Sequence, residues 1–154
     1  MQPPLEISQY FIDELQVKVN QEYEGNGTHS GTLDVDFDIR KAPDGPRFLI
    51  TMTIDANKTE KAFSGAPYRV FLALSGFFEF AEGTDKETID RLIGPNGLSI
   101  LYGIARGTVA QATACCRHSK FILPAYNFMA LLDQKAQQAA RAKKSSTKRK
   151  KPEA

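Results

Sequence analysis

Few side chains in this chain have the types and spacing that catalysis needs. The two histidines, His29 and His118, lie far apart in the sequence, one in a glycine-rich run and the other in a polar stretch. A general base must lie within hydrogen-bond reach of the group it serves. No acid, base or nucleophile stands at a recognisable spacing from either histidine. We therefore expect a protein that is not an enzyme and that uses no cofactor.

Two adjacent cysteines raise the possibility of a metal site. Cys115 and Cys116 are followed by His118, but no fourth ligand stands at a familiar zinc-binding spacing. We interpret the two cysteines as small apolar residues at the end of a helix, with a metal site as the alternative.

Three carboxylates at two-residue spacing form the other candidate cation site. Asp34, Asp36 and Asp38 share one face if their segment is a strand. A single strand does not wrap a cation as a turning loop does, so we expect no metal there. Three unpaired carboxylates are too costly to bury, and we predict that they form an exposed acidic face.

The elements that carry these residues begin with strands. Apolar side chains alternate with polar ones over residues 33–39 and 48–54, with the period of two that half-buried strands show. Residues 15–19 alternate in the same way, whereas residues 68–80 are apolar in both phases, as in a strand that is covered twice or forms an interface. Proline and Asp-Gly at residues 42–46 predict a turn. Four strands with short connections predict an antiparallel meander.

Helices are predicted after the last strand. Thr84 and Glu87 have the spacing of a capping box, which would open a short helix that Gly94 ends. Pro95 would begin a second helix, and Phe128 lies in a third. Strands first and helices afterwards predict an α+β fold, with the helices packed on one face of a four-stranded antiparallel sheet.

The second helix carries a stripe of small residues, Gly103, Gly107 and Ala110. Small side chains on one helix face let another backbone approach closely. The stripe predicts either a tight crossing within the chain or an interface between subunits of an oligomer.

The charge is divided between an acidic body and a basic end. Residues 135–154 hold eight Lys or Arg and one Glu, a net charge of +7, while residues 1–134 hold twelve basic and seventeen acidic residues, a net charge of −5. We expect a domain over residues 1–140 and a basic tail over residues 141–154, disordered from Lys143 onward because it has no apolar face to bury. No membrane-spanning segment or secretory signal is readable, so we expect a cytoplasmic protein without membrane insertion.

Two segments resemble SecB, the bacterial export chaperone family. Residues 94–106, GPNGLSILYGIAR, look like the start of the family's main helix, except that Gly103 stands where the family has proline. Residues 123–131, LPAYNFMAL, are similar to the family's Leu-Pro-Pro-Val-Asn-Phe-Asp-Ala-Leu element. Residues 76–78 resemble the end of its last strand, and the order of elements agrees over about residues 10–140.

The resemblance implies an ATP-independent holdase, a homotetramer built as a dimer of dimers, that binds unfolded or precursor polypeptides in an apolar groove. Family members keep preproteins export-competent for the ATPase SecA, which docks on an acidic sheet face; Asp34, Asp36 and Asp38 are the candidates for that face, and the stripe of Gly103, Gly107 and Ala110 is the candidate oligomer interface. From their positions beside the last strand and the third helix, we assign the groove to Phe71, Phe77, Phe78, Leu123, Tyr126, Phe128 and Leu131.

Two departures from the family leave other functions open. The chain ends in basic residues where typical members are acidic or polar, and Phe71 stands where the family has an acidic SecA contact. A SecB-like chaperone for a non-export client, such as an antitoxin, is one alternative. The other is a nucleic-acid- or ribosome-associated module that uses the basic tail to bind phosphates.

Overall fold

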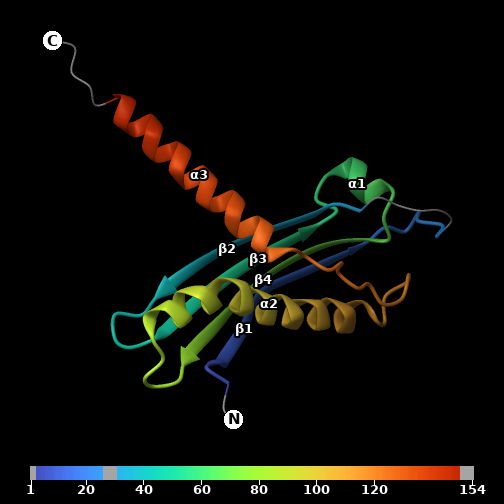
Figure 1. Ribbon diagram of the computed structural model, residues 1–154. Helices are drawn as coiled ribbons and strands as arrows, with labels where there is room; N and C mark the ends of the chain where they lie inside the picture. The colour runs from blue at the N-terminus through green and yellow to red at the C-terminus, as the bar shows by residue number, and fades with distance from the viewer. Residues whose placement is uncertain (1–2, 26–30, 150–154) are drawn as a thin grey trace. The chain divides into compact units, whose positions relative to one another are not determined.

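The computed structural model describes residues 3–25 and 31–149, and it has the expected α+β class (Figure 1). The chain forms two compact units, residues 1–124 and residues 125–154. The first unit contains four strands and two helices: β1 (Leu5–Val19), β2 (Leu33–Lys41), β3 (Arg47–Ala56), α1 (Glu60–Ser64), β4 (Tyr68–Phe80) and α2 (Lys86–Thr113). The second unit contains α3 (Phe128–Arg149).

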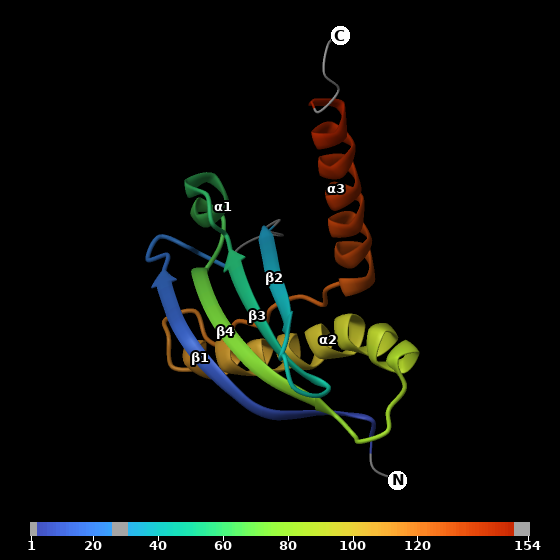
Figure 2. The same ribbon diagram turned by 90° about the vertical axis from the view of Figure 1, so that its left-hand side faces the viewer.

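The four strands form one antiparallel sheet in the order β1-β4-β3-β2, visible in Figure 2. The predicted meander is therefore correct from β2 to β4 and wrong for β1, which pairs with β4 instead of β2. The physical reason is the connection over residues 20–32, which is too long for a tight hairpin and lets the chain cross to the far edge of the sheet. Both β1 and β2 are edge strands.

The strand β1 begins ten residues earlier than the sequence pattern predicted. Its pairing with β4 shifts register between Ile7 and Gln9 and again between Ile12 and Glu14. Each shift adds a residue that flips the side-chain alternation. The period-two pattern is therefore broken before Leu15, where we expected the strand to begin.

The two helices predicted on either side of Gly94 and Pro95 are one continuous helix, α2. Its N-cap is Asp85 and not the predicted Thr84; Thr88 donates its backbone N–H to the Asp85 carboxylate over 3.0 Å. The Thr88 hydroxyl also donates to this carboxylate, and the two hydrogen bonds, the hydroxyl's first, lower the pKa of Asp85. The helix continues through the proline because its buried stripe runs past it, and packing of that stripe outweighs the local cost.

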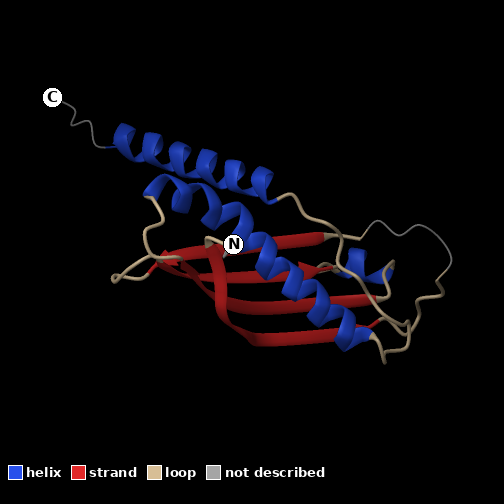
Figure 3. Ribbon diagram, turned by 60° about the horizontal axis from the view of Figure 1, so that its bottom comes forward, coloured by secondary structure: helices blue, strands red, loops and turns tan. Residues whose placement is uncertain are grey.

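The core lies between α2 and one face of the sheet, which we call the inner face (Figure 3). Gly97 allows the close approach of the two layers, because a Cβ at that position would lie 2.7 Å from Cδ1 of Ile50 on β3. The side chains that are almost fully buried come from alternate positions of β3 and β4 and from one stripe of α2: Ile50, Met52, Ile54, Tyr68, Val70, Leu72, Leu74, Phe78, Leu98, Leu101 and Val109.

Two further helices complete the described structure. Between β3 and β4, Thr59 caps the short helix α1 by accepting from the N–H of Ala62. The helix α3 runs to Arg149 and includes residues 143–149, where the sequence predicted disorder; these residues are rich in Lys and Ser, with Lys among the good helix formers. The predicted division at residue 140 stays a prediction. No helix among the described residues is long and apolar enough to cross a membrane.

Candidate functional site

Residues 123 and 124, at the start of the second segment singled out in the sequence, are held by hydrogen bonds to the first segment, 94–106. The hydroxyl of Tyr102 on α2 donates to the carbonyl of Pro124. Nε of Arg106, one turn later, donates to the carbonyl of Leu123 over 2.9 Å. The chain that follows α2 therefore runs back along this helix, and Leu123 is fully buried.

A second set of polar contacts fixes the turn after α2. The buried hydroxyl of Tyr68 donates to the carbonyl of Ser119 over 2.7 Å and accepts the N–H of His118 over 2.9 Å. Burial raises the pKa of Tyr68, and the hydrogen bond from His118 partly opposes that rise. Nε2 of His118 lies 2.6 Å from the carbonyl of Asn20, to which it donates. His118 thus joins the end of β1 to this turn.

The described residues offer no constellation for metal binding: no three His, Cys, Asp or Glu side chains among them are grouped to hold an ion. Cys115 is exposed and Cys116 is partly exposed, both as free thiols. His29 lies outside the described residues.

The seven residues predicted to line a groove belong to both units, and the groove itself stays a prediction. Phe78 and Leu123 are fully buried in the core of the first unit. Phe71 and Phe77 lie on the opposite side of the sheet, which we call the outer face; Phe71 is half-buried and Phe77 is 41% exposed. The other three belong to the second unit: Tyr126, Phe128 and Leu131. In that unit the rings of Tyr126 and Phe128 pack with centroids 5.1 Å apart.

A cluster that the sequence analysis missed stands out on β1. Four large apolar side chains are more than a third exposed, and we call them the β1 apolar edge: Tyr10 (51%), Phe11 (43%), Ile12 (38%) and Leu15 (37%). Tyr10, Ile12 and Leu15 are in register with inner-face positions of β4, and Phe11 lies on the outer face, where its ring packs edge-on against Phe77 at 6.1 Å. In the sequence, the signal that could have revealed this surface is the occurrence of four large apolar residues within six positions.

The backbone of β1 adds to this surface. In the described sheet β1 hydrogen-bonds to β4 alone, so its other side presents unpaired N–H and C=O groups. Proteins usually protect such edges with charged side chains, proline or short strands. A fifteen-residue edge strand that exposes apolar side chains is instead typical of a surface that another polypeptide covers.

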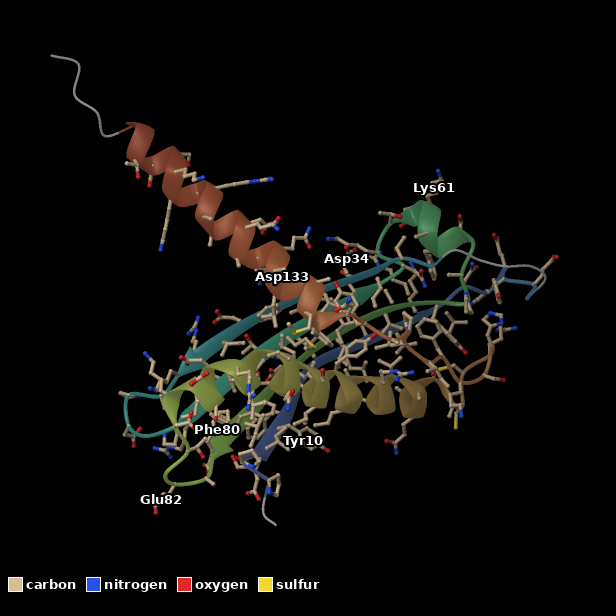
Figure 4. The ribbon with its side chains drawn as sticks, viewed as in Figure 1. Tyr10, Asp34, Lys61, Phe80, Glu82 and Asp133 are labelled. Atoms are coloured by element: carbon tan, nitrogen blue, oxygen red, sulfur yellow. The ribbon has the colours of Figure 1, made fainter. Side chains whose placement is uncertain are left out.

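The acidic row is on the other edge strand. Asp34, Asp36 and Asp38 are exposed on the outer face of β2, as predicted, and Asp38 pairs with Arg40 at 2.7 Å. Figure 4 labels Tyr10 on β1 and Asp34 on β2, which mark the two edges of the sheet. The apolar edge and the acidic row are thus separated by β4 and β3.

The two glycines of the small-residue stripe of α2 face open space. A Cβ at Gly103 or Gly107 would have no atom of another element within 4 Å, and Ala110 is only partly exposed. Among the described residues, these glycines therefore serve no tight helix crossing. The alternative of a subunit interface stays a prediction.

Comparison with known proteins supports the fold. No family model matches the sequence, and no curated protein matches it. Among solved structures, the chain is similar to the SecB-like chaperone of Mycobacterium tuberculosis in complex with a ChAD peptide from the HigA1 antitoxin, with a TM-score of 0.54, 13% identity, and coverage of 80% of this chain and 91% of that one.

A protein of unknown function from Streptococcus agalactiae also matches, with a TM-score of 0.41, 12% identity, and coverage of 79% and 97% of the two chains. The similarity to the Mycobacterium tuberculosis protein shows that the fold of this chain is SecB-like.

Proposed function

We propose that this protein is a chaperone that holds non-native polypeptides without ATP, and that the β1 apolar edge binds them. The observation that carries the proposal is the exposure of Tyr10, Phe11, Ile12 and Leu15 on an unpaired edge strand of a SecB-like fold. An extended client segment can add to such an edge by backbone hydrogen bonds, which are independent of client sequence. The exposed side chains add affinity where the client is apolar.

The strength of this surface fits holding rather than permanent binding. Full burial of one large apolar side chain contributes about 1.5–3 kcal/mol. The four side chains are already about half covered, so each offers about half of that to a client, before the client's ordering entropy is subtracted. We therefore expect weak, reversible contacts that an unfolded chain makes at several places at once. Release then needs no ATP.

We propose a non-export protein, and not a preprotein, as the client. The similar Mycobacterium protein is complexed with a peptide from an antitoxin. SecA docking would require an acidic outer face; here Asp34, Asp36 and Asp38 lie on the edge strand β2, while Phe71, near the start of β4, stands where the family has an acidic SecA contact. We place SecA docking second. A binding titration of SecA with wild-type protein and with Asp36→Lys distinguishes the two.

A homo-oligomer is part of the proposal. Gly103 and Gly107 give α2 a flat, open face that a second copy of the helix can approach. Native mass spectrometry should show a dimer or a tetramer, and Gly107→Leu should reduce it to a smaller species. A wild-type protein that is monomeric at micromolar concentration would remove the oligomer from the proposal.

The experiment that tests the proposed function compares one substitution at two exposed positions. Ile12 on β1 is 38% exposed, and Ile122, in the segment after α2, is 53% exposed. We expect Ile12→Ser to weaken the suppression of client aggregation several-fold and Ile122→Ser to leave it unchanged, both measured by light scattering without ATP. Wild-type protein that does not suppress aggregation would refute the holdase function. Equal effects of both variants would refute the assignment to β1.

A further inference from the structure

The helix α3 is exposed on all sides over much of its length. It spans Phe128–Arg149, and every residue from 136 to 147 is exposed. An α-helix turns once in about 3.6 residues, so this run includes every side of the helix. A helix that is polar all round is usually supported by pairs of oppositely charged side chains.

In this part of α3 all charges have the same sign. Residues 134–149 contain no Asp or Glu, and their basic residues are Lys135, Arg141, Lys143, Lys144, Lys148 and Arg149. The ion pairs found within 4 Å among the described residues belong to the first unit. Arg141 and Lys144 are three positions apart, and like charges at that spacing disfavour a helix. An anionic partner would remove this repulsion.

A polyanion suits these exposed cations better than the carboxylates of another protein. Exposed pairs between single charges contribute little to binding. Double-stranded DNA carries one negative charge per about 1.7 Å of its axis, and it releases condensed counterions when cations of a protein replace them. This release makes a run of exposed Lys and Arg effective where isolated ion pairs are weak.

The uncharged residues of α3 narrow the choice of polyanion. Residues 134–149 include no aromatic side chain on which the bases of a single strand would stack. They also include no apolar side chain larger than alanine, which binding to a membrane surface would need. Both single-stranded nucleic acid and a lipid surface are therefore disfavoured.

The dimensions and polar residues of α3 fit the major groove of DNA. Gln134, Gln137 and Gln138 are exposed and lie within about 60° of Arg141 around the helix. Glutamine and arginine are among the side chains that hydrogen-bond to base edges in that groove. The groove is about 12 Å wide, and a helix with its side chains is about 10–12 Å wide. The major groove of A-form RNA is too narrow for such a helix.

We propose that α3 binds double-stranded DNA and lies in its major groove. Arg141 and Lys144 contact phosphates, and the three glutamines on the same side of the helix hydrogen-bond to the DNA. This DNA-binding surface is distinct from the β1 apolar edge, because it belongs to the second unit. DNA binding is a further activity that goes beyond the holdase function.

The salt dependence of binding to a labelled duplex tests the proposal. The probe is a fluorescein-labelled DNA duplex of about 20 base pairs, longer than the roughly 24 Å that residues 134–149 span as a helix. With about three phosphate contacts, the affinity of the full chain should fall about 40-fold between 50 and 200 mM salt. Fluorescence anisotropy measures the affinity at each salt concentration. Failure of the wild-type protein to bind the duplex at 50 mM salt would overturn the proposal.

Substitutions assign the binding to one side of α3. Arg141→Gln/Lys144→Gln should reduce the slope of log affinity against log salt by about 2, because two phosphate contacts are lost. Glutamine is a good helix former, and circular dichroism checks that the helix is retained. Lys58→Gln/Lys61→Gln removes the same charge from exposed positions of the first unit and should leave the slope unchanged. Equal changes in both double variants would overturn the assignment to α3.

A control within the helix is Lys143, which is exposed and lies about 160° around the helix from Arg141. Lys143→Gln should lower the slope less than Arg141→Gln does. Single-stranded DNA, an RNA duplex of the same sequence and vesicles that contain anionic lipid are the competing ligands. Binding to any of them as tight as binding to the DNA duplex would overturn the assignment to the major groove.

The aggregation assay separates DNA binding from the holdase function. Arg141→Gln/Lys144→Gln should suppress client aggregation as the wild-type protein does, because the β1 apolar edge is intact. If the wild-type protein binds the duplex but does not suppress aggregation, the holdase function fails and DNA binding stands. If it suppresses aggregation but does not bind the duplex, DNA binding fails and the holdase function stands.

Discussion

The neighbouring strands β4 and β1 are both rich in apolar residues, but inner-face side chains of β4 are buried whereas those of β1 around Ile12 are exposed. On β4 the inner-face side chains from Tyr68 to Phe80 are at most 6% exposed. On β1, hydrogen-bonded alongside, Tyr10, Ile12 and Leu15 are 37–51% exposed. The two strands are paired in one sheet, and what differs is that β4 is central and β1 is an edge.

This difference teaches that apolar content alone does not define a core. A central strand is covered by its neighbours and by α2, so its apolar side chains stabilise the fold. An edge strand that keeps apolar side chains in solvent gains no folding free energy from their exposed parts. Their presence is explained if another polypeptide covers them, which is the basis of the proposed function.

The largest difference between the two strands is expected when the same leucine-to-alanine substitution is made at two register partners, one on each strand. Leu72 on β4 is fully buried, and Leu15 on β1 is opposite it and 37% exposed. Leu72→Ala should lower the free energy of unfolding by about 2–5 kcal/mol, because it leaves a cavity. Leu15→Ala should lower it by less than about 1.5 kcal/mol. Urea denaturation followed by circular dichroism measures both, and equal losses would contradict the contrast between core and edge.

Removing one hydroxyl from a tyrosine on each strand tests the same contrast between the buried strand β4 and the exposed edge β1. Tyr68→Phe leaves the carbonyl of Ser119 and the N–H of His118 without their partner, so we expect a loss of about 1–3 kcal/mol of stability. Tyr10→Phe, on the exposed edge, should change stability little.

The same pair should differ at high pH. Burial holds the pKa of Tyr68 above its unfolded value, so the phenol's contribution is complete below the ordinary tyrosine range and is lost as pH rises through it. Tyr68→Phe should remove this part of the alkaline destabilisation, and Tyr10→Phe should retain it. Thermal melts at pH 8 to 11 test the difference.

The smallest expected effect is an increase in stability, whereas the changes above lower it. Gly103→Ala should stabilise the isolated chain by about 0.5–1 kcal/mol, because a Cβ there meets no other element and alanine favours the helix. Gly97→Ala should gain less or nothing, since its Cβ would displace Ile50. Thermal melts of the two variants at low concentration measure this, and a large loss for Gly103→Ala would mean that another surface already covers it.

The sequence was sufficient for the α+β class and for three of the four strand positions, because alternation at 33–39 and 48–54 is clean and residues 68–80 are apolar in both phases. It was insufficient for β1, where two register shifts break the alternation, and for the pairing of β1 with β4, which depends on a contact between distant segments. Local rules also misplaced the helix ends: Pro95 reads as a start in isolation, but the buried stripe of α2 continues through it.

The candidate site was only partly within reach of the sequence. The exposure of Asp34, Asp36 and Asp38 followed from the cost of burying carboxylates. The predicted groove stays a prediction. Position beside a strand end does not determine which face a side chain occupies, and Phe77 and Phe78 are neighbours on opposite faces of the sheet. The β1 apolar edge depends on which strand is at the edge, which local pattern does not reveal.

The most direct test of the central claim is photo-crosslinking from the edge itself. A benzoylphenylalanine at Tyr10 preserves an aromatic side chain on β1, and the same group at Ile122 provides an exposed control in the first unit. The proposed function predicts a crosslink from position 10 to an unfolded client and none to the same client in its native state, with little product from position 122. Suppression of aggregation without any crosslink from position 10, or with equal crosslinks from both positions, would contradict it.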